Sequence, residues 1–258
     1  MDAYSSFARV YDTFMDNVPY EEWADFIIEL LREYGIQEGR VLDLGCGTGS
    51  MTRLLYQAGY DMLGADLSEE MLEIALEKQM EELEKAGEDQ SGILYLQQDM
   101  RELEIYPKVS AVVSCCDCLN YILEPYELLE TFQRVKDSLM EDGIFFFDFN
   151  TSHKYRDVIG ETTIAEDRED CSFIWDNYYY EDEEINEYEL TLFIKEEDQE
   201  GLYRKYQETH LQRGYTLEEI QNLLKEAGFT VLQVYDDYTK EAVTQDSERI
   251  CLVAKNRV

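Results

Sequence analysis

The chain has 258 residues, 45% of them hydrophobic, which is enough for one large α/β domain or for a core domain with an insert. Its 58 acidic and 22 basic residues give a formal net charge of −36, and a surface this negative repels phosphate backbones and anionic membranes. Composition and charge therefore exclude nucleic acid and membrane as favoured partners, and no apolar run of about 18 residues marks a membrane span.

The cysteines and the N-terminus indicate a reducing compartment. The six cysteines are not spaced like a secreted disulfide framework, and the polar N-terminus does not resemble a signal peptide. Cys115, Cys116 and Cys118 are interpreted as small buried residues at a strand end rather than as metal ligands, because the chain has only two histidines and no second cysteine cluster. We expect a cytoplasmic protein without a metal site.

In chain order, the first strong pattern is a helix at 20–34 that carries its large apolar side chains on one face. Strands and helices then alternate, with strands at 41–44, 61–66, 93–97, 109–114 and 144–149 and helices at 50–58, 69–86 and 125–140. This alternation predicts an α/β fold, a doubly wound and mostly parallel sheet with helices on both faces.

The α/β alternation breaks after Asn150. Segments 172–180, 187–195 and 202–210 are rich in aromatic and β-branched residues, which predicts antiparallel strands. We interpret 151–213 as a small antiparallel β insert after the fifth strand, a substrate cover over the carboxyl edge of the sheet. The main domain, residues 1–150 and 214–258, then resumes with a helix at 217–227 and strands at 229–235 and 248–254.

A glycine-rich turn follows the first strand of the sheet. Gly45, Gly47 and Gly49 stand at alternate positions, directly after the strand at 41–44 and directly before a helix. Glycine suits a sharp turn in which the backbone approaches a ligand, and the free N–H groups of the following helix point at that ligand. The third glycine comes one residue too early for a dinucleotide site, and no lysine follows as in a phosphate-binding P-loop. The turn therefore predicts a site for a different nucleoside-like cofactor at the carboxyl end of a parallel strand.

The string DLGCGTG at residues 43–49 resembles motif I of the class I S-adenosylmethionine-dependent methyltransferases. The resemblance implies a seven-stranded sheet of that family's type and S-adenosyl-L-methionine as the cofactor. It also implies that the first acid of the motif orients the glycine loop or the methionine ammonium, while the loop backbone surrounds the methionine part. The cofactor residues predicted in this segment are Asp43, Gly45, Cys46, Gly47 and Gly49.

Other parts of the chain agree with this resemblance. Asp66 closes the second strand, where the family has an acid for the ribose hydroxyls, and a carboxylate can accept both hydrogen bonds of a cis-diol. The resemblance implies that Leu67 packs on the adenine and that Asp99 accepts from the adenine amino group. The opening F-A-x-x-Y-D resembles a lid segment, so residues 1–35 are expected to form N-terminal lid helices, with Tyr11 near the methionine carboxylate. The remaining cofactor residues predicted in this way are Gln98, Met100, Ser114, Cys115 and Cys116.

The residues that bind the methyl acceptor are indicated by position and residue type. The NPPY-like signature of DNA and protein-amide methyltransferases is absent after the fourth strand, which argues against nucleobase and glutamine-amide acceptors. Aromatic rings of the insert could hold an amine through cation–π contacts, or could form the insert's own core. The insert ends in the motif H-x-x-R-x-Y, and its trio of His210, Arg213 and Tyr215 could reach the mouth of the active site. His210 could act as a base, and Arg213 could hold a substrate carboxylate or pair with a neighbouring acid. The predicted substrate residues are Asn120, Tyr121, His153, Trp175, Tyr179, His210 and Arg213, and the predicted catalytic residues are His210 and Tyr11.

These observations predict a methyltransferase that acts on a small molecule, such as an amine or a carboxylate-bearing metabolite. Methyl transfer from a sulfonium is an in-line displacement in which the protein mainly aligns the acceptor and excludes water, so no catalytic motif is obligatory. Two alternatives stay open, an RNA-modifying methyltransferase, which would need a basic stripe, and a non-catalytic protein that binds the cofactor. We expect a monomer or a homodimer.

Overall fold

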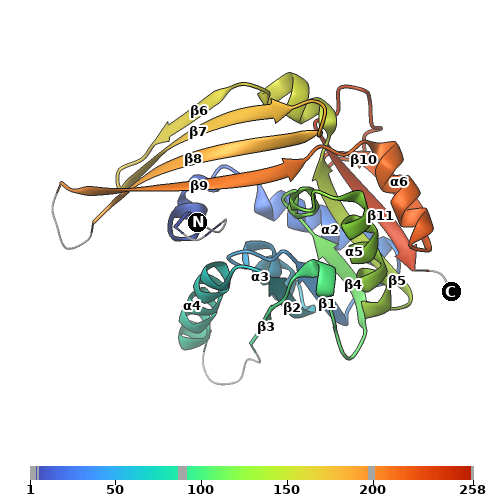
Figure 1. The fold of residues 1–258 in the computed structure, drawn as a ribbon. Coiled ribbons are helices and arrows are strands. Elements are labelled where there is room, and N and C mark those ends of the chain that lie inside the picture. The colour runs from blue at the N-terminus through green and yellow to red at the C-terminus, as the bar shows by residue number, and fades with distance from the viewer. Residues whose placement is uncertain (1–3, 5, 87–91, 197–200, 257–258) are drawn as a thin grey trace.

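The larger of two sheets has seven strands in the order β10–β11–β5–β4–β1–β2–β3 (Figure 1). This computed structural model describes residues 4, 6–86, 92–196 and 201–256. Strands β1 to β5 run parallel to one another, whereas β11 is antiparallel to both of its neighbours, β5 and β10. The strand bounds are β1 Arg40–Leu44, β2 Asp61–Asp66, β3 Leu94–Gln97, β4 Val109–Ser114, β5 Leu139–Asn150, β10 Phe229–Asp236 and β11 Arg249–Asn256. The predicted doubly wound and mostly parallel sheet is confirmed.

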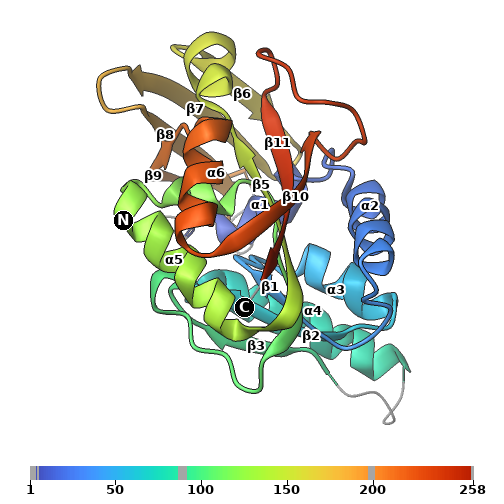
Figure 2. The same cartoon turned by 90° about the vertical axis from the view of Figure 1, so that its right-hand side faces the viewer.

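Helices cover both faces of this sheet (Figure 2). Helices α2 (Tyr20–Glu33) and α3 (Ser50–Gln57) pack on one face, and α5 (Pro125–Ser138) and α6 (Leu217–Glu226) pack on the other. Helix α4 (Glu69–Ala86) packs against β2 and β3. Strand β5 shows why both faces are apolar, since Phe146 joins the α2–α3 cluster while Phe145 and Phe147 join the α5–α6 cluster.

The second sheet has four antiparallel strands in the order β6–β7–β8–β9. Their bounds are β6 Thr163–Asp167, β7 Cys171–Tyr180, β8 Ile185–Lys195 and β9 Tyr203–Arg213. The sequence predicts three of these strands, and the short edge strand β6 was missed. A π-helical turn, η3 (Lys154–Ile159), connects β5 to this sheet. The structure therefore has the predicted fold class, a seven-stranded α/β sheet with an antiparallel β insert after the fifth strand.

The four-stranded sheet arches over the end of the seven-stranded sheet, with the N-terminal helix α1 (Ala8–Phe14) beneath it (Figure 1). Val10 and Phe14 of α1 share a hydrophobic cluster with Phe173 on β7 and Leu192 on β8. This cluster fixes the N-terminal segment against the inner face of the insert.

Helix α5 ends at Ser138, two residues before the predicted end, and β5 starts at Leu139. None of the helices in the described part of the chain combines the length and the apolar character needed to span a bilayer. All six cysteines are free thiols. The described residues contain no group of three or more histidine, cysteine or acidic side chains that could hold a metal ion.

Candidate active site

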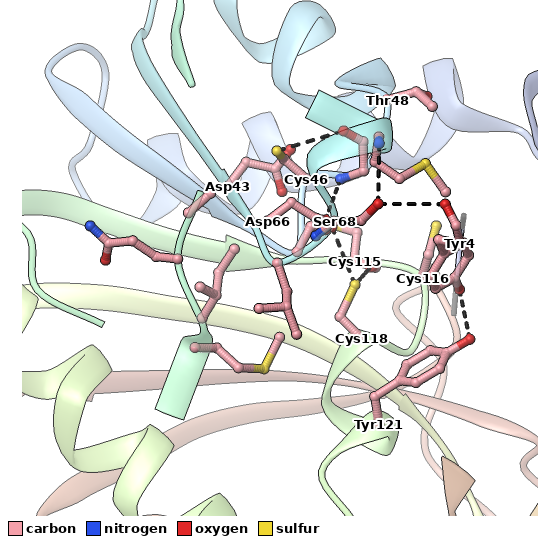
Figure 3. A pocket seen from close by; sticks show the side chains of 18 of the residues that line it. Tyr4, Asp43, Cys46, Thr48, Asp66, Ser68, Cys115, Cys116, Cys118 and Tyr121 are labelled. Atoms are coloured by element: carbon pink, nitrogen blue, oxygen red, sulfur yellow. Dashed lines mark hydrogen bonds between the residues drawn. The ribbon is translucent and has the colours of Figure 1, made fainter. Parts of the chain in front are cut away.

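A cavity of about 900 Å³ opens at the carboxyl ends of β1, β2, β3 and β4 (Figure 3). The strand ends contribute one wall, with Asp43 from β1, Asp66 from β2 and Cys115 from just after β4. The N-terminal segment contributes the opposite wall through Tyr4 and Tyr11. The size lies within the usual range of small-molecule sites, and the position follows the rule that open α/β sheets bind ligands at the carboxyl ends of their strands.

The glycine turn leaves bare backbone along this cavity. Gly45 and Gly47 line it with φ values of +77° and +52°. A Cβ on Gly45 would lie 2.6 Å from the Sγ of Cys118, whereas a Cβ on Gly47 would meet no protein atom within 4 Å. Gly49 does not line the cavity, because it starts α3 and its missing side chain makes room for Tyr95. Gly47 therefore stands where a ligand can approach the main chain.

Asp66 lies beside the glycine turn with both carboxylate oxygens aimed at backbone donors. Its Oδ2 accepts from the N–H of Gly47 at 2.8 Å, and its Oδ1 accepts from the N–H of Ser68 at 2.9 Å. Burial raises the pKa of Asp66, and these backbone hydrogen bonds act in the opposite direction. Each oxygen retains acceptor capacity on its second lone pair, which is what a ribose diol requires.

Asp43 is buried under the glycine turn. Its Oδ2 accepts from the hydroxyl of Thr52 on α3 at 2.5 Å. Desolvation raises the pKa of Asp43 to about 7, although the bond from Thr52 favours the charged form. Asp43 therefore titrates near neutral pH, and a cation in the cavity would favour its ionised form.

The far end of the cavity is partly apolar. Leu67 lines it with 61% of its surface exposed, and Met100 lines it as well. Asp99 also lines the cavity, but its carboxylate binds the guanidinium of Arg101 at 2.6 Å, which lowers the pKa of Asp99. Gln98 lines the cavity too and donates to the carbonyl of Glu104 at 3.3 Å.

The loop after β4 forms the centre of the cavity. Cys115 and Cys116 line it, whereas Ser114 does not, because Ser114 is fully buried and its hydroxyl donates to the carbonyl of Leu44 at 2.7 Å. Cys116 and Asp117 are consecutive non-glycine residues with positive φ, 63° and 51°. Such backbone strain is concentrated at functional sites, where the surrounding structure holds it in place.

Four tyrosines line the cavity from the N-terminal segment and from the turn after β4, namely Tyr4, Tyr11, Tyr20 and Tyr121. Burial raises the pKa of Tyr11 well above its ordinary value, so its phenol stays neutral. The hydroxyl of Tyr121 lies 2.7 Å from that of Tyr4 and 3.0 Å from Nδ1 of His210 on β9. The structure thus brings together Tyr11, Tyr121 and His210, which the sequence predicts from distant segments.

Three other predicted acceptor residues lie away from the cavity. Asn120 is fully buried and binds backbone, because its Nδ2 donates to the carbonyls of Asn150 and Arg213 and its Oδ1 accepts from the N–H of Asn150. His153 contacts Asp157 at 2.9 Å within η3. Arg213 binds Glu184 at 2.5 Å, which is the neighbouring-acid alternative.

Strand alternation explains the position of Arg213. Residues paired in register lie on the same face of a sheet, and His210 pairs with Tyr188, whereas Arg213 pairs with Ile185. The offset of three from His210 to Arg213 therefore puts the two side chains on opposite faces, so they cannot form the predicted trio with Tyr215. Tyr215 itself is fully buried and donates to the carbonyl of Ile122.

Trp175 and Tyr179 lie on the inner face of β7 but do not line the large cavity. The ring of Trp175 packs edge-on against Tyr188 at 4.8 Å between centroids. Trp175 therefore contributes to the packing of the insert and of α1 against it rather than to a cage around the cavity.

Sequence reasoning missed a buried polar cluster between the two sheets. Arg249 binds Asp117 at 2.8 Å and Asp148 at 3.0 Å, and Gln212 donates to the other oxygen of Asp117 at 2.8 Å. Asp148 also accepts from the backbone N–H groups of Cys116 and Asp117, so the cluster holds the strained loop. An acid inside the apolar run IFFFDF was the available signal, because a buried charge requires a partner.

Comparisons with known proteins agree with this geometry. A family described as "Methyltransferase domain" matches residues 11–234. A protein of Geobacillus sp. (strain WCH70) that bears the name "Putative methyltransferase" is 39% identical over 253 residues, 98% of this chain and 99% of the relative.

Solved structures show the same architecture. An S-adenosylmethionine-dependent methyltransferase from Clostridium acetobutylicum ATCC 824 has a TM-score of 0.86 at 29% identity, over 100% of both chains. CalS10, an amino pentose methyltransferase from Micromonospora echinaspora with S-adenosylmethionine bound, shares the fold with a TM-score of 0.71 at 16% identity, over 99% of this chain and 97% of its own. The chain therefore belongs to the class I S-adenosylmethionine-dependent methyltransferases.

Proposed function

We propose that this methyltransferase binds S-adenosylmethionine in the cavity at the carboxyl ends of β1 to β4 and methylates a small neutral or cationic molecule. The observation that carries the proposal is the pairing of Asp66, whose carboxylate can accept from a diol, with the bare backbone at Gly47. Together they form a cradle for a nucleoside that carries no phosphate, because the site offers acceptors and backbone but no lysine.

The residues of the cavity fit the three parts of this cofactor. Asp66 would hold the ribose diol, and the exposed side chain of Leu67 together with Met100 would cover the adenine. Asp43 and the backbone at Gly45 would hold the methionine part, with Tyr11 as the lid residue beside it. When bound, the cofactor supplies an activated methyl group, and the chain's task is to orient the acceptor and exclude water.

The charge around the cavity favours a neutral or cationic acceptor over a carboxylate. Acidic residues line it from β1, β2, α4 and the end of β3. Among the described residues that line the cavity, Arg101 is the one basic side chain, and it is bound to Asp99. A carboxylate would meet repulsion here, whereas an amine would be attracted. An amine acceptor would also match CalS10, an amino pentose methyltransferase that shares this fold.

We further propose that the insert at 151–213 and the N-terminal segment at 1–35 cover the substrate. Helix α1 lies between the insert and the rest of the molecule, and its side chains share a cluster with β7 and β8. The six free thiols suit the reducing conditions of the cytoplasm, where we place the enzyme.

Isothermal titration with S-adenosylmethionine tests the cofactor site directly. We expect binding with a stoichiometry of about one per chain and a raised melting temperature, because a ligand that binds only the folded state stabilises it. Absence of both heat and stabilisation at ligand concentrations of about 1 mM would contradict the proposal.

Incubation with methyl-labelled cofactor and a metabolite extract tests the acceptor class. We expect the label in a small amine or another neutral or cationic molecule. Label recovered in RNA would overturn the small-molecule proposal, and cofactor binding without any transfer would support the non-catalytic alternative.

A further inference from the structure

Four polar side chains connect the cavity to the inner face of the insert. Tyr4 and Tyr121 line the cavity, and their hydroxyl oxygens lie 2.7 Å apart (Figure 3). The hydroxyl of Tyr121 lies 3.0 Å from Nδ1 of His210, and Nε2 of His210 lies 3.3 Å from Oε2 of Glu208. These four side chains thus form a continuous series of contacts from a wall of the cavity to a buried carboxylate.

The carboxylate at the buried end of this series is held in place by backbone donors. Glu208 is 3% exposed, and its carboxylate accepts from the backbone N–H groups of Tyr4, Ser6 and Phe7. Backbone donors stabilise the ionised form of a carboxylate. The bond from the N–H of Tyr4 also holds Tyr4 at the cavity wall. Glu208 therefore positions Tyr4 at one end of the series and His210 at the other.

The fixed carboxylate sets the donor-to-acceptor direction of the hydrogen bonds in this series. Nε2 of His210 faces Glu208 at an ion-pair distance without an aligned hydrogen bond, which favours the tautomer with the proton on Nε2. Nδ1 then carries a lone pair that accepts from Tyr121, and Tyr121 in turn accepts from Tyr4. The oxygen of Tyr4 is left as the acceptor that faces the cavity.

Burial keeps both phenols neutral. It raises the pKa of Tyr4 and of Tyr121 well above the ordinary value for tyrosine. Neutral hydroxyls can pass on a proton by giving one up as they gain one, and an imidazole can accept it. The imidazolium that forms is stabilised by the Glu208 carboxylate beside it.

We propose that Tyr4, Tyr121, His210 and Glu208 form a relay that removes a proton from the methyl acceptor. This inference rests on the proposed function. As the acceptor atom's lone pair forms its bond to the methyl carbon, its proton passes to the oxygen of Tyr4. The hydroxyl proton of Tyr4 passes to Tyr121, and that of Tyr121 passes to Nδ1 of His210. The acceptor atom therefore carries a proton, as in an amine, an alcohol or a thiol, because a carboxylate has no proton to donate to Tyr4.

Nitrogen NMR of the histidines tests the relay without an acceptor. The chain has two histidines, so ¹⁵N-histidine labelling gives two imidazole signal sets, and His153→Asn assigns them. We expect the neutral form of His210 to carry its proton on Nε2, and we expect Tyr121→Phe to move the Nδ1 resonance to that of a nitrogen without a hydrogen bond. A proton on Nδ1, or a resonance that Tyr121→Phe leaves in place, would overturn the relay.

Sinefungin provides a binding test, because it carries an amine where S-adenosylmethionine carries the transferable methyl group. Its ammonium can donate to Tyr4, whereas S-adenosylhomocysteine has no donor at that place. We expect the wild type to bind sinefungin about tenfold more tightly than S-adenosylhomocysteine, which corresponds to one charge-assisted hydrogen bond. Tyr4→Phe should reduce that ratio to near one and leave the affinity for S-adenosylhomocysteine unchanged, and His153→Asn should preserve the ratio.

The two binding results separate the relay from the proposed function. The relay would be overturned if the wild type bound sinefungin and S-adenosylhomocysteine equally well. It would also be overturned if Tyr4→Phe kept the wild-type preference for sinefungin. In both cases the proposed cofactor site would stand. Failure of the wild type to bind either compound would instead overturn the proposed function.

Discussion

Two aspartates at the strand ends, the buried Asp43 and the half-buried Asp66, line the end of the cavity where we propose the cofactor. Both lose hydration on folding, and burial raises the pKa of each. They differ in their partners, since Asp66 binds two backbone N–H groups and Asp43 binds one hydroxyl. Desolvation is the main cause of the pKa shift at both residues, and at Asp43 it raises the pKa to about 7.

The Asp66→Ala substitution should weaken binding of S-adenosylmethionine by about 1–3 kcal/mol, because it removes a pair of charge-assisted hydrogen bonds to the ribose. Isothermal titration measures the loss. Asp61→Ala is the matched control, since Asp61 begins the same strand and contacts Arg40 at the surface. Equal affinities in wild type and Asp66→Ala would contradict the ribose role.

The pH dependence of folding should report Asp43. Its folded pKa, raised to about 7, lies above its ordinary value of 3.8, so its stabilising contribution is complete below pH 3.8 and is lost as the pH rises toward 7. Within that window the wild type should lose roughly 1.4 kcal/mol per pH unit relative to Asp43→Asn, which cannot ionise. Urea unfolding of both proteins between pH 5 and 8 measures this, and parallel pH profiles would show that Asp43 does not titrate there.

At the scale of elements, the end of β5, the turn η2 (Cys118–Tyr121) and the end of β9 are joined by one side chain, Asn120. Its amide binds backbone on both strands and contributes nothing to the cavity directly. Its role is to hold the insert to the seven-stranded sheet near Tyr121.

Removal of this amide by Asn120→Ala should lower the free energy of unfolding by about 3 kcal/mol. It would leave the N–H of Asn150 and the carbonyls of Asn150 and Arg213 without this partner, and each of these three groups should cost about 1 kcal/mol, the low end of the range for an unsatisfied group. Urea unfolding measures the change. The exposed Asn17→Ala should stay within about 0.5 kcal/mol, and a similarly small effect for Asn120→Ala would contradict the structural role.

Strand β9 shows how much of an element the sequence predicts. The composition of 202–210 indicates a strand, and the strand exists, extending to Arg213. The motif H-x-x-R-x-Y does not act as a unit, because strand geometry separates an odd offset onto two faces. The residues that share the inner face with His210 are its even-offset neighbours, Glu208 and Gln212, which a strict period of two would have identified.

At the scale of the whole molecule, the net charge of −36 dominates. Like charges on a folded surface repel one another and destabilise the compact state. Salt shortens the Debye length from about 30 Å at 0.01 M to about 8 Å at 0.15 M, so exposed acids interact less.

The melting temperature should therefore rise when sodium chloride is increased from about 0.01 M to 0.15 M, over the range in which screening changes most. Each kcal/mol of repulsion relieved should raise it by about 2–4 °C for a chain of this size. Circular dichroism measures the transition, with an uncharged osmolyte at equal osmolality as the control. An unchanged or lower melting temperature in salt would contradict the role of charge repulsion.

The sequence by itself determined the α/β fold class and the half of the cavity where we propose the cofactor. Strand, glycine turn and helix follow one another within residues 40–57, so the geometry there is local and can be read from contiguous residues. Only the tertiary structure decided the acceptor half, where Tyr4, Tyr121, Glu208 and His210 meet from three distant segments. Which face of the insert points inward depends on packing against α1 and the loop after β4, and such long-range pairing has no signature in the order of the residues.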